Sequence, residues 1–442
     1  MGYIRGEARC QQTLFPACLD DAIPADHVCR VIDAFVERLD FTALGFVRAE
    51  SAETGRPGYD PRDLLKLYLY GYLQQVRSSR RLESECRRNM ELMWLLERLE
   101  PDHKSIAEFR RLHRDAVTAA GAELVRFARS VGLVQGEWVA IDGSKFRAVS
   151  GTDGVREREA LKRYLNEMER SDAEDEVVVY PAAVAEALKK LKAHPEPEAE
   201  FMRIGEGFAP AYNVQTAVDA EHALIVAQTV LTAANDNTSL LPMAISAKEA
   251  VGSPETLNVV ADKGYSNGEQ AQRCEQQGIL PHVPAQRGVN NQADGMLLDR
   301  SQFVYDESSD TFTCPNGATL NRHHRDTTKP SVLYTASPRD CAHCPLKKQC
   351  TTASRRTVRR HLYEDALRRM HERATPQAMR LRRSTVEHPF ATLKYRILGH
   401  PRLLLRGLAG AQTEISLATI AYNMKRMINV LGSQKLAMAL TN

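Results

Sequence analysis

Three residues in the last quarter of the chain have types and a spacing that suit phosphate chemistry. Arg383, Glu387 and Lys394 follow the pattern R-x3-E-x6-K. At about 100° per residue they fall within about 40° of one another on a helix. A carboxylate between two cations suits a phosphodiester site, because the acid can hold a divalent metal while the cations hold phosphate oxygens. An exposed ion-pair ladder has the same pattern, and Pro389 interrupts the stripe unless the helix continues past it.

Two aspartates supply further carboxylates, each at the end of a predicted strand. Asp142 follows the β-rich run 138–141, and Asp262 follows the run 257–261. Isolated aspartates at strand ends often only cap a helix or a turn, so the interest of this pair depends on Glu387. Three carboxylates suit two hard cations that keep some water ligands, as Mg²⁺ usually does. The residues alone leave both the metal-binding and the structural interpretation open.

Four of the nine cysteines have metal-ligand spacing. Cys314, Cys341, Cys344 and Cys350 give C-x26-C-x2-C-x5-C within 37 residues. A C-x2-C knuckle with two further cysteines predicts a structural zinc site that is closed to catalysis. His343 inside the knuckle is an alternative ligand, and reduced buried thiols or a redox dithiol are the other interpretations. The other cysteines are scattered, and the odd total argues against a disulfide framework.

Charge is distributed unevenly along the 442 residues. The formal net charge is only +3, but residues 341–442 hold 19 Lys+Arg against 5 Asp+Glu, and the other 340 residues hold 40 against 51. A C-terminal quarter this basic predicts a polyanionic partner, most simply nucleic acid, although a solvated helix surface gives the same count. Six Lys and Arg residues between positions 347 and 360 directly follow the cysteine knuckle. We therefore expect this segment to present cations to a DNA backbone.

The chain lacks the sequence features of a membrane or secreted protein. No run of 18 apolar residues occurs, and the first residues lack the apolar core of a signal peptide. We therefore expect a cytoplasmic protein without a membrane span.

The elements that must position these residues divide the chain into a helical part and a mixed part. Asp60-Pro61 predicts the start of a buried helix over 62–76 within a helical region that ends near residue 133. This bundle is compatible with a helix-turn-helix DNA reader or with a plain structural role. Strand signals then occur at 138–141 and 257–261, with an antiparallel hairpin at 212–218 and 223–231. A helix is expected from about residue 237.

Together these motifs resemble the DDE transposases of bacterial insertion sequences. The resemblance rests on the order of Ile141-Asp142-Gly143-Ser144, Ala261-Asp262-Lys263-Gly264-Tyr265 and the R-x3-E-x6-K motif. It covers nearly the whole chain, since residues 211–219 are similar to the family's second strand and residues 406–408, 414–417 and 421–423 to its terminal helix. One departure is Arg380, which stands where the family often has a tyrosine.

The resemblance implies an α+β fold with two domains. A helical N-terminal DNA-binding domain, 1–133, would precede a ribonuclease H-like catalytic domain, 134–442. The core would be a mixed five-stranded sheet flanked by helices, with Asp142 on the first strand, Asp262 on the fourth and Glu387 on a following helix. Its other expected parts are a charged helical insert (151–205), a four-cysteine zinc-type insert (300–360), the glutamate helix (376–396) and a C-terminal helix (408–431).

The resemblance also implies a reaction. Asp142, Asp262 and Glu387 would hold two Mg²⁺ or Mn²⁺ ions that assist cleavage of a DNA strand at the ends of the element. The freed 3′-OH would then attack target DNA, with Arg383 and Lys394 contacting phosphate. Double-stranded DNA is the implied partner, and such enzymes usually act as dimers or larger assemblies. The alternatives are a related metal-dependent DNA nuclease and an inactive or domesticated DNA-binding protein.

Overall fold

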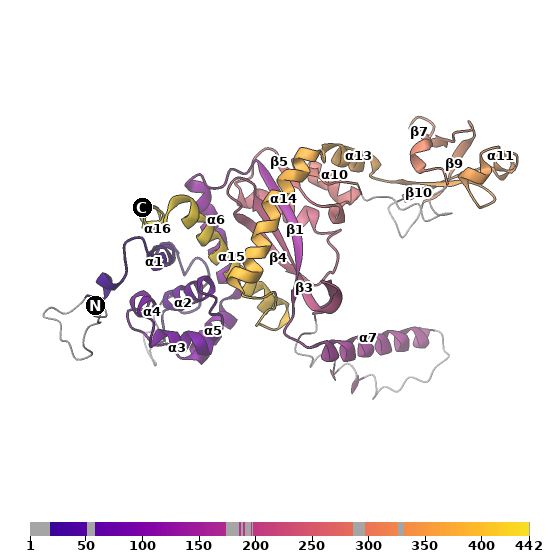
Figure 1. The fold of residues 1–442 in the computed structure, drawn as a ribbon. Helices are drawn as coiled ribbons and strands as arrows, with labels where there is room; N and C mark the ends of the chain where they lie inside the picture. Colours follow the sequence, from indigo (N-terminus) through magenta and orange to yellow (C-terminus); the bar gives the residue numbers. More distant parts are fainter. Residues whose placement is uncertain are drawn as a thin grey trace, which may run out of the picture.

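The computed structural model describes residues 18–50, 58–173, 185–186, 189–190, 196, 198–285, 297–325 and 331–441. These residues form a helical N-terminal region, a mixed sheet with helices packed on it, and a second, antiparallel sheet (Figure 1). The fold is therefore α+β, as expected. Within the described residues, no helix combines the length and the apolar character that crossing a membrane requires.

The N-terminal region is a bundle of short helices. Asp60 caps α2 by accepting a hydrogen bond from the Arg62 amide at 2.8 Å, and Pro61 is the first helical residue, as the sequence predicts. Most of α2 is buried, including Tyr68 and Tyr72. The helices of this region are η1 (Leu19–Ala22), α1 (Val28–Arg38), α2 (Pro61–Leu73), α3 (Ser79–Cys86), α4 (Met90–Leu95), α5 (His103–Leu112) and α6 (Arg114–Ser130).

A mixed sheet positions the predicted acids. Its strand order is β2-β3-β1-β5-β6, with β4 also paired to β3. The pairs among β1, β2, β3 and β4 are antiparallel, whereas β1–β5 and β5–β6 are parallel. The strands are β1 (Trp138–Arg147), β2 (Glu200–Ile204), β3 (Gly207–Asp219), β4 (Ile225–Leu231), β5 (Leu257–Val260) and β6 (Ile279–His282).

Two expectations about this sheet were wrong. The described sheet has six strands rather than five, because β2, at the end of the predicted insert 151–205, pairs with β3. Asp142 lies within β1 rather than at its end, because β1 continues to Arg147 by pairing with β3. The predicted hairpin is confirmed as β3 and β4.

Helices cover both faces of this sheet and join it to the N-terminal region. α14 packs on β1 and β5, α9 packs on β3 and β4, and α15 lies between β4 and the helices α2 and α6 (Figure 1). The remaining elements are α7 (Thr152–Ala173), α9 (Leu240–Ala250), η2 (Lys263–Tyr265), α10 (Gly268–Gln276), α13 (Glu364–Arg373), α14 (Pro376–Ala391), the π-helical η5 (Thr392–Ile397), α15 (Gly407–Leu431) and α16 (Ser433–Thr441). α7 belongs to the predicted insert, of which 174–184, 187–188, 191–195 and 197 lie outside the described residues.

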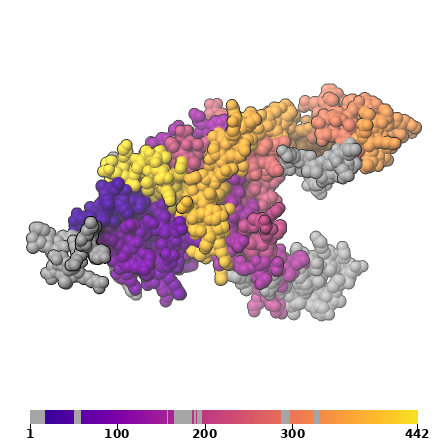
Figure 2. Space-filling view, in the orientation of Figure 1, coloured from indigo at the N-terminus to yellow at the C-terminus, as the bar shows by residue number. Residues whose placement is uncertain are grey.

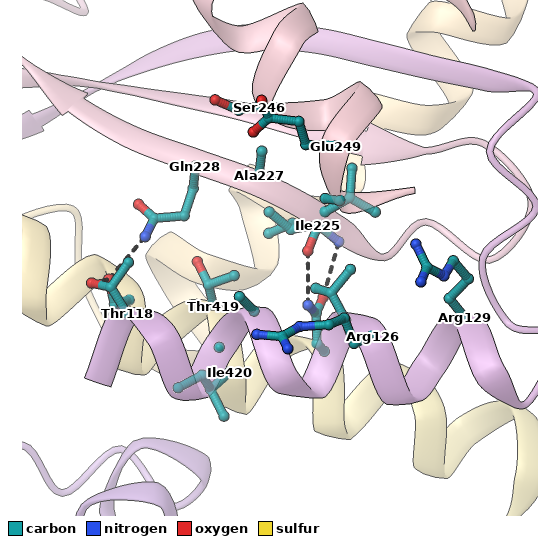
Figure 3. A pocket seen from close by; sticks show the side chains of 17 residues that line it. Thr118, Arg126, Arg129, Ile225, Ala227, Gln228, Ser246, Glu249, Thr419 and Ile420 are labelled. Atoms are coloured by element: carbon teal, nitrogen blue, oxygen red, sulfur yellow. Dashed lines mark hydrogen bonds between the residues drawn. The ribbon is translucent and has the colours of Figure 1, made fainter. Parts of the chain in front are cut away.

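A pocket marks the seam between the N-terminal region and the sheet. α6, β4, α9 and α15 line it, and several hydrogen bonds connect these elements across it (Figure 3). Asn423 of α15 bonds both backbone groups of Ile225, and Gln228 and Thr118 both reach the Ser416 hydroxyl. These bonds fix α15 and α6 against β4, so the seam is a structural joint.

The second sheet forms a module that projects from the rest of the molecule (Figures 1 and 2). Its strand order is β11-β10-β9-β8-β7, every pair is antiparallel, and it has its own small apolar core around Phe312 and Leu320. The module contains η4 (Arg300–Gln302), β7 (Val304–Asp306), β8 (Thr311–Thr313), β9 (Thr319–Arg325), β10 (Ser331–Ala336), α11 (Pro338–Ala342), α12 (Lys347–Cys350) and β11 (Thr357–His361).

Candidate active site

Parallel pairing of β1 with β5 brings two of the predicted acids together. Ala140 of β1 lies opposite Val260 of β5, the last residue of that strand. If this register is continued by two residues, Asp142 lies opposite Asp262. Because β5 ends while β1 continues, the edge of β1 beside Asp142 is open to side chains. We call Asp142 and Asp262 the acid pair.

Asp142 is partly buried and in contact with a cation. Its Oδ1 lies 2.9 Å from Arg382 Nη2, and the two side chains are 21% and 18% exposed. Burial raises the pKa of Asp142 to about 6, while the Arg382 guanidinium lowers it and the nearby Asp262 carboxylate raises it. Burial and a second carboxylate both disfavour the ionised acid, so the acid pair attracts cations.

Asp262 is held by the turn that follows β5. Its carboxylate caps η2 by accepting a hydrogen bond from the Gly264 amide at 2.7 Å. A Cβ atom on residue 264 would lie only 2.9 Å from Asp262 Oδ1, so a side chain there would displace the Asp262 carboxylate. The Asp-x-Gly segment therefore fixes Asp262 beside β1.

α14 and the π-helical segment after it direct two cations toward the acid pair. Val386 of α14 packs in one apolar cluster with Ala140 of β1, and Arg382, one turn earlier, reaches Asp142. Lys394 Nζ donates to Ser144 Oγ at 2.6 Å and lies 5.1 Å from the centre of the Phe146 ring. Burial lowers the pKa of Lys394, whereas Asp142 raises it. Both cations thus lie on the face of β1 that carries Asp142.

The predicted stripe of Arg383, Glu387 and Lys394 is only partly present. The helix continues past Pro389, but it ends at Ala391 and becomes a π-helix. A π-turn takes more residues than an α-turn, so it rotates the residues that follow out of the earlier register. Lys394 therefore faces β1, whereas Arg383 and Glu387 are exposed and line an open depression of α14.

Glu387 does not meet the acid pair in this structure. In the part of the chain that the structure describes, only His27, Cys29 and Glu91 place three His, Cys, Asp or Glu donor atoms within 4.8 Å of one another. Asp142 instead contacts Arg382, the neighbour of Arg383 in the sequence. The geometry does not test what Glu387 does during catalysis, so its role stays a prediction.

A further acid near the acid pair was missed from the sequence. Asp236, in the loop between β4 and α9, accepts hydrogen bonds at 2.7 Å from the side-chain amides of both Asn213 and Gln215. Its Oδ1 also lies 3.6 Å from Lys145 Nζ. A Cβ atom on Gly143 would lie 2.8 Å from the same oxygen, so Asp236 lies directly against β1. The sequence signal that could have identified Asp236 was its position between a predicted strand and the start of a predicted helix.

Two family models match this chain. Residues 17–112 match a model described as "Transposase domain (DUF772)", and residues 313–428 match one described as "Transposase DDE domain". The second match includes the four grouped cysteines, Glu387 and Lys394, whereas the acid pair lies outside both.

The chain thus carries two transposase domains, one of them a DDE domain.

The family expected from the sequence is thereby confirmed, and this transposase is an enzyme that acts on DNA. No curated protein matches the chain. Among solved structures, the cryo-EM structure of a piggyBac transposase synaptic complex with hairpin DNA is similar at 9% identity, over 93% of this chain and 78% of that chain, with a TM-score of 0.33. Because that TM-score is low, the identification as a transposase rests on the two family models.

The four grouped cysteines of the transposase lie together in the projecting module. Cys314, Cys341, Cys344 and Cys350 are free thiols that line one small cavity. Burial raises the pKa of Cys350, Arg356 lowers it, and the other three thiols raise it. The four donors fit zinc by type and share one cavity, but no three of their sulfur atoms lie within 4.8 Å of one another. The zinc site therefore stays a prediction.

Two of the six cations after the cysteine knuckle hold this module of the transposase together. Arg356 donates to the carbonyl oxygens of Cys350 and Leu298, and the Arg360 guanidinium lies 4.1 Å from the centre of the Tyr305 ring. These two side chains bind the module's own groups, so the set expected to face DNA is smaller than the sequence suggested.

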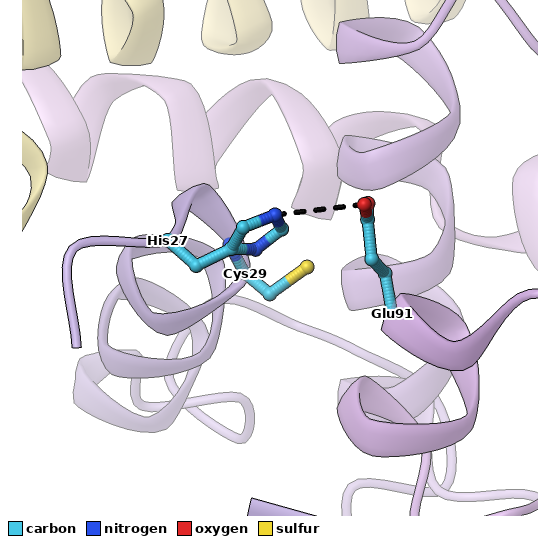
Figure 4. Close-up of side chains that lie close together, drawn as sticks. All are labelled: His27, Cys29 and Glu91. Atoms are coloured by element: carbon cyan, nitrogen blue, oxygen red, sulfur yellow. Dashed lines mark hydrogen bonds and ion pairs between the residues drawn. The ribbon is translucent and has the colours of Figure 1, made fainter. Parts of the chain in front are cut away.

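The N-terminal group His27, Cys29 and Glu91 is explained by structural contacts (Figure 4). His27 caps α1 by accepting from the Cys29 amide, and its Nε2 lies 3.5 Å from a Glu91 oxygen. The other Glu91 oxygen accepts from Tyr70 at 2.7 Å. Burial raises the pKa of Cys29 to about 12, with smaller contributions from nearby acids. His27 and Glu91 thus have structural partners and the Cys29 side chain is buried, so we assign the group to the packing of α1 on α4.

Proposed function

We propose that this transposase cleaves DNA strands and joins the freed 3′ ends to target DNA at the acid pair, with divalent cations as cofactors. The observation that carries the proposal is the parallel register of β1 and β5, which pairs Asp142 with Asp262 when it is continued by two residues. Two neighbouring carboxylates in a partly buried place repel each other, and bound cations remove that repulsion. Carboxylate oxygens are the ligands that Mg²⁺ and Mn²⁺ prefer.

The acid pair and Glu387 are the residues we assign to the cations. Cations bound there supply Lewis-acid chemistry, which activates the attacking oxygen and stabilises the leaving 3′ oxygen. In the resting protein, Arg382 is the counter-ion of Asp142. We infer that Arg382 gives up this contact when cations bind and that Glu387 then completes the ligand set.

Cations of α14 and η5 supply the phosphate contacts in this proposal. Arg383 is exposed beside Glu387, where its planar guanidinium can hold two oxygens of one phosphate group. Lys394 already lies against Ser144, two residues beyond Asp142. A lysine at this position binds a phosphate as a point charge.

We also propose that the sheet is ribonuclease H-like. The order β4-β3-β1-β5-β6, with antiparallel pairs on one side of β1 and parallel pairs on the other, supports this assignment, with β2 as an addition. Residues 134–442 would then be the catalytic domain and residues 1–133 the helical DNA-binding domain. An assembly of two or more chains on double-stranded DNA belongs to the same proposal.

For the projecting module, we propose a structural zinc ion held by the four grouped cysteines. The shared cavity and the C-x2-C knuckle support this site. Zinc would stabilise a module whose apolar core is small.

Nicking of supercoiled plasmid DNA with Mg²⁺ or Mn²⁺ tests the proposed function. Asp142→Ala and Asp262→Ala are expected to lower the nicking rate at least about 1,000-fold, because each removes a ligand of the reacting centre. Glu387→Ala is expected to have a similar effect. The matched control is Glu255→Ala, an exposed acid of the loop before β5.

Undiminished nicking in Asp142→Ala and Asp262→Ala would show that the acid pair is not the reacting centre. Loss of nicking in those two variants, with full activity in Glu387→Ala, would retain the acid pair and remove Glu387 from the ligand set.

A further inference from the structure

Lys145 carries a buried ammonium group that has no hydrogen-bond acceptor among the described residues. The side chain is only 19% exposed, and its nearest carboxylate oxygen, Asp236 Oδ1, is 3.6 Å away. That separation is longer than a hydrogen bond between charged groups, which is about 2.7–2.9 Å. A buried ammonium without an acceptor is unfavourable, since it has lost its hydration.

The acid pair is close enough to Lys145 to act on its ammonium group electrostatically. Burial lowers the pKa of Lys145. The pKa is raised by three nearby carboxylates, those of Asp236, Asp142 and Asp262. Side chains alternate along β1, so Lys145 lies on the face opposite to Asp142. Because β5 ends at Val260, no strand among the described residues pairs with this edge of β1 beyond Ala140, and only the turn after β5 lies there.

The other cations at the acid pair already have partners. Arg382 contacts Asp142, and Lys394 donates to Ser144, both from the α14 side of β1. Lys145 approaches from the other side, and its donors are unused. A negatively charged acceptor that enters between the two faces would therefore meet Lys145.

Asp236 holds Lys145 in this position. The Asp236 carboxylate is fixed by amides of Asn213 and Gln215, which are fully buried. The Gln215 carbonyl oxygen in turn accepts from the Tyr265 hydroxyl, in the turn that follows Asp262. This network connects the counter-ion of Lys145 to the segment that carries one of the two acids.

We propose that Lys145 is a further catalytic residue that donates hydrogen bonds to an oxygen of the DNA phosphate held at the acid pair, and that Asp236 positions it. This inference rests on the proposed function of the acid pair. The ammonium group keeps its protons and only stabilises the negative charge that gathers on the phosphate during the reaction, so no bond to Lys145 forms or breaks. Donors aimed at such charge contribute most in the transition state.

Lys145→Met tests this role, because methionine keeps the length of the side chain and removes the charge. We expect kcat for nicking of supercoiled plasmid with Mn²⁺ to fall about 100- to 1,000-fold with an unchanged KM for plasmid. Thermal unfolding should occur near the wild-type temperature, because the removed ammonium group has no hydrogen-bond acceptor and Asp236 keeps its bonds from Asn213 and Gln215. Lys145→Arg should recover part of the lost kcat.

A double variant separates catalysis from a merely structural ion pair. Lys145→Met with Asp236→Asn removes both charges, so it restores the fold if the pair only supports the structure. We expect the double variant to fold and still to nick slowly. Wild-type nicking in Lys145→Met would overturn the inference, as would recovery of both stability and nicking in the double variant. If Lys145→Met fails to fold, the nicking rates of the double variant and of Lys145→Arg decide instead. Wild-type nicking in the folded double variant would then overturn the inference.

Asp142→Ala in the same assay distinguishes the two levels of the proposal. If Asp142→Ala is inactive and Lys145→Met nicks normally, only the role of Lys145 is wrong. If Asp142→Ala nicks normally, the proposed function itself is wrong, and the role of Lys145 falls with it.

Discussion

At the scale of single residues, the contact between Arg382 and Asp142 could not be predicted from the sequence. The R-x3-E-x6-K motif drew attention to Arg383 and Glu387, but spacing alone does not say which stripe of a helix faces the sheet. That choice depends on burial, and the residues buried around Glu387 are Thr385, Val386, Pro389 and Phe390. Arg382 precedes Val386 by one turn, so it shares the buried side and reaches the acid.

The raised pKa of Asp142 predicts that cation binding depends on pH. The folded value of about 6 lies above the ordinary 3.8, so the native state holds this proton more tightly than the unfolded chain. The metal-free protein therefore loses stability as the pH rises toward about 6. The ionised Asp142 carboxylate that forms is the state that binds a cation. Below about pH 6 the affinity for Mn²⁺ should fall roughly tenfold per pH unit.

Calorimetric titration with MnCl₂ between about pH 5 and about pH 8 measures this dependence. Asp142→Asn should remove both the high affinity and most of its pH dependence. Equal affinity at the two ends of the range would contradict the assignment of Asp142 as a ligand.

At the scale of elements, strong local patterns were predictable and short strands were not. β1, β5 and the β3–β4 hairpin were recognised because apolar, β-branched runs end at polar or turn residues. β7 has only three residues, and β9 includes charged side chains, so neither has a readable strand pattern. The five-stranded module could therefore be predicted only as a cysteine segment, and its architecture depends on pairing between distant strands.

A buried ion pair joins the N-terminal region to α15 and predicts a large effect on stability. Arg77, after α2, bonds Glu414, and the two side chains are 6% and 0% exposed. The second Glu414 oxygen accepts from the Leu404 and Leu405 amides. Arg77→Met leaves a buried charge unpaired and should lower the free energy of unfolding by about 3–5 kcal/mol.

Urea unfolding measures this change, and Arg77→Met with Glu414→Gln should lose less than Arg77→Met alone. Arg126→Ala, which removes an exposed ion pair, is the control. If Arg77→Met lowers the free energy of unfolding no more than the control Arg126→Ala does, the buried pair has no structural role.

The zinc proposal predicts about one zinc ion per chain in purified protein. Cys344→Ser should release it and make the module sensitive to proteases, because the module's own apolar core is small. Cys18→Ser, at an exposed cysteine outside the group, is the control and should keep the metal. Metal analysis checks both variants. Less than about half an equivalent of zinc in the unmodified protein would argue for a cavity of reduced thiols instead.

At the scale of the whole molecule, the cations of the basic C-terminal quarter are spread over several elements. Some lie in the module that projects from the core (Figure 2), and others lie on α13, α14, η5 and α15 (Figure 1). Because cations of the module also bind its own groups, overall charge overstates the surface available to DNA. The uneven charge nonetheless predicts a strongly salt-dependent affinity.

Binding of a duplex DNA at several salt concentrations tests this dependence. The slope of log K against log salt should be about −0.9 per neutralised phosphate, and Arg383→Ala should reduce its magnitude by about one unit. Arg273→Ala on α10, an exposed arginine paired with Glu269, should leave the slope unchanged. A flat salt response in the unmodified protein would contradict phosphate contacts as the source of affinity.

The central claim is that Asp142 and Asp262 share bound cations, and iron-induced cleavage of the polypeptide tests it most directly. With Fe²⁺ in place of Mg²⁺ and ascorbate as reductant, the chain should be cut close to residues 142 and 262, because radicals form at the bound metal. Excess Mg²⁺ should suppress both cuts, and Asp142→Ala should abolish them. Cuts elsewhere, unaffected by Mg²⁺ and by Asp142→Ala, would contradict the account.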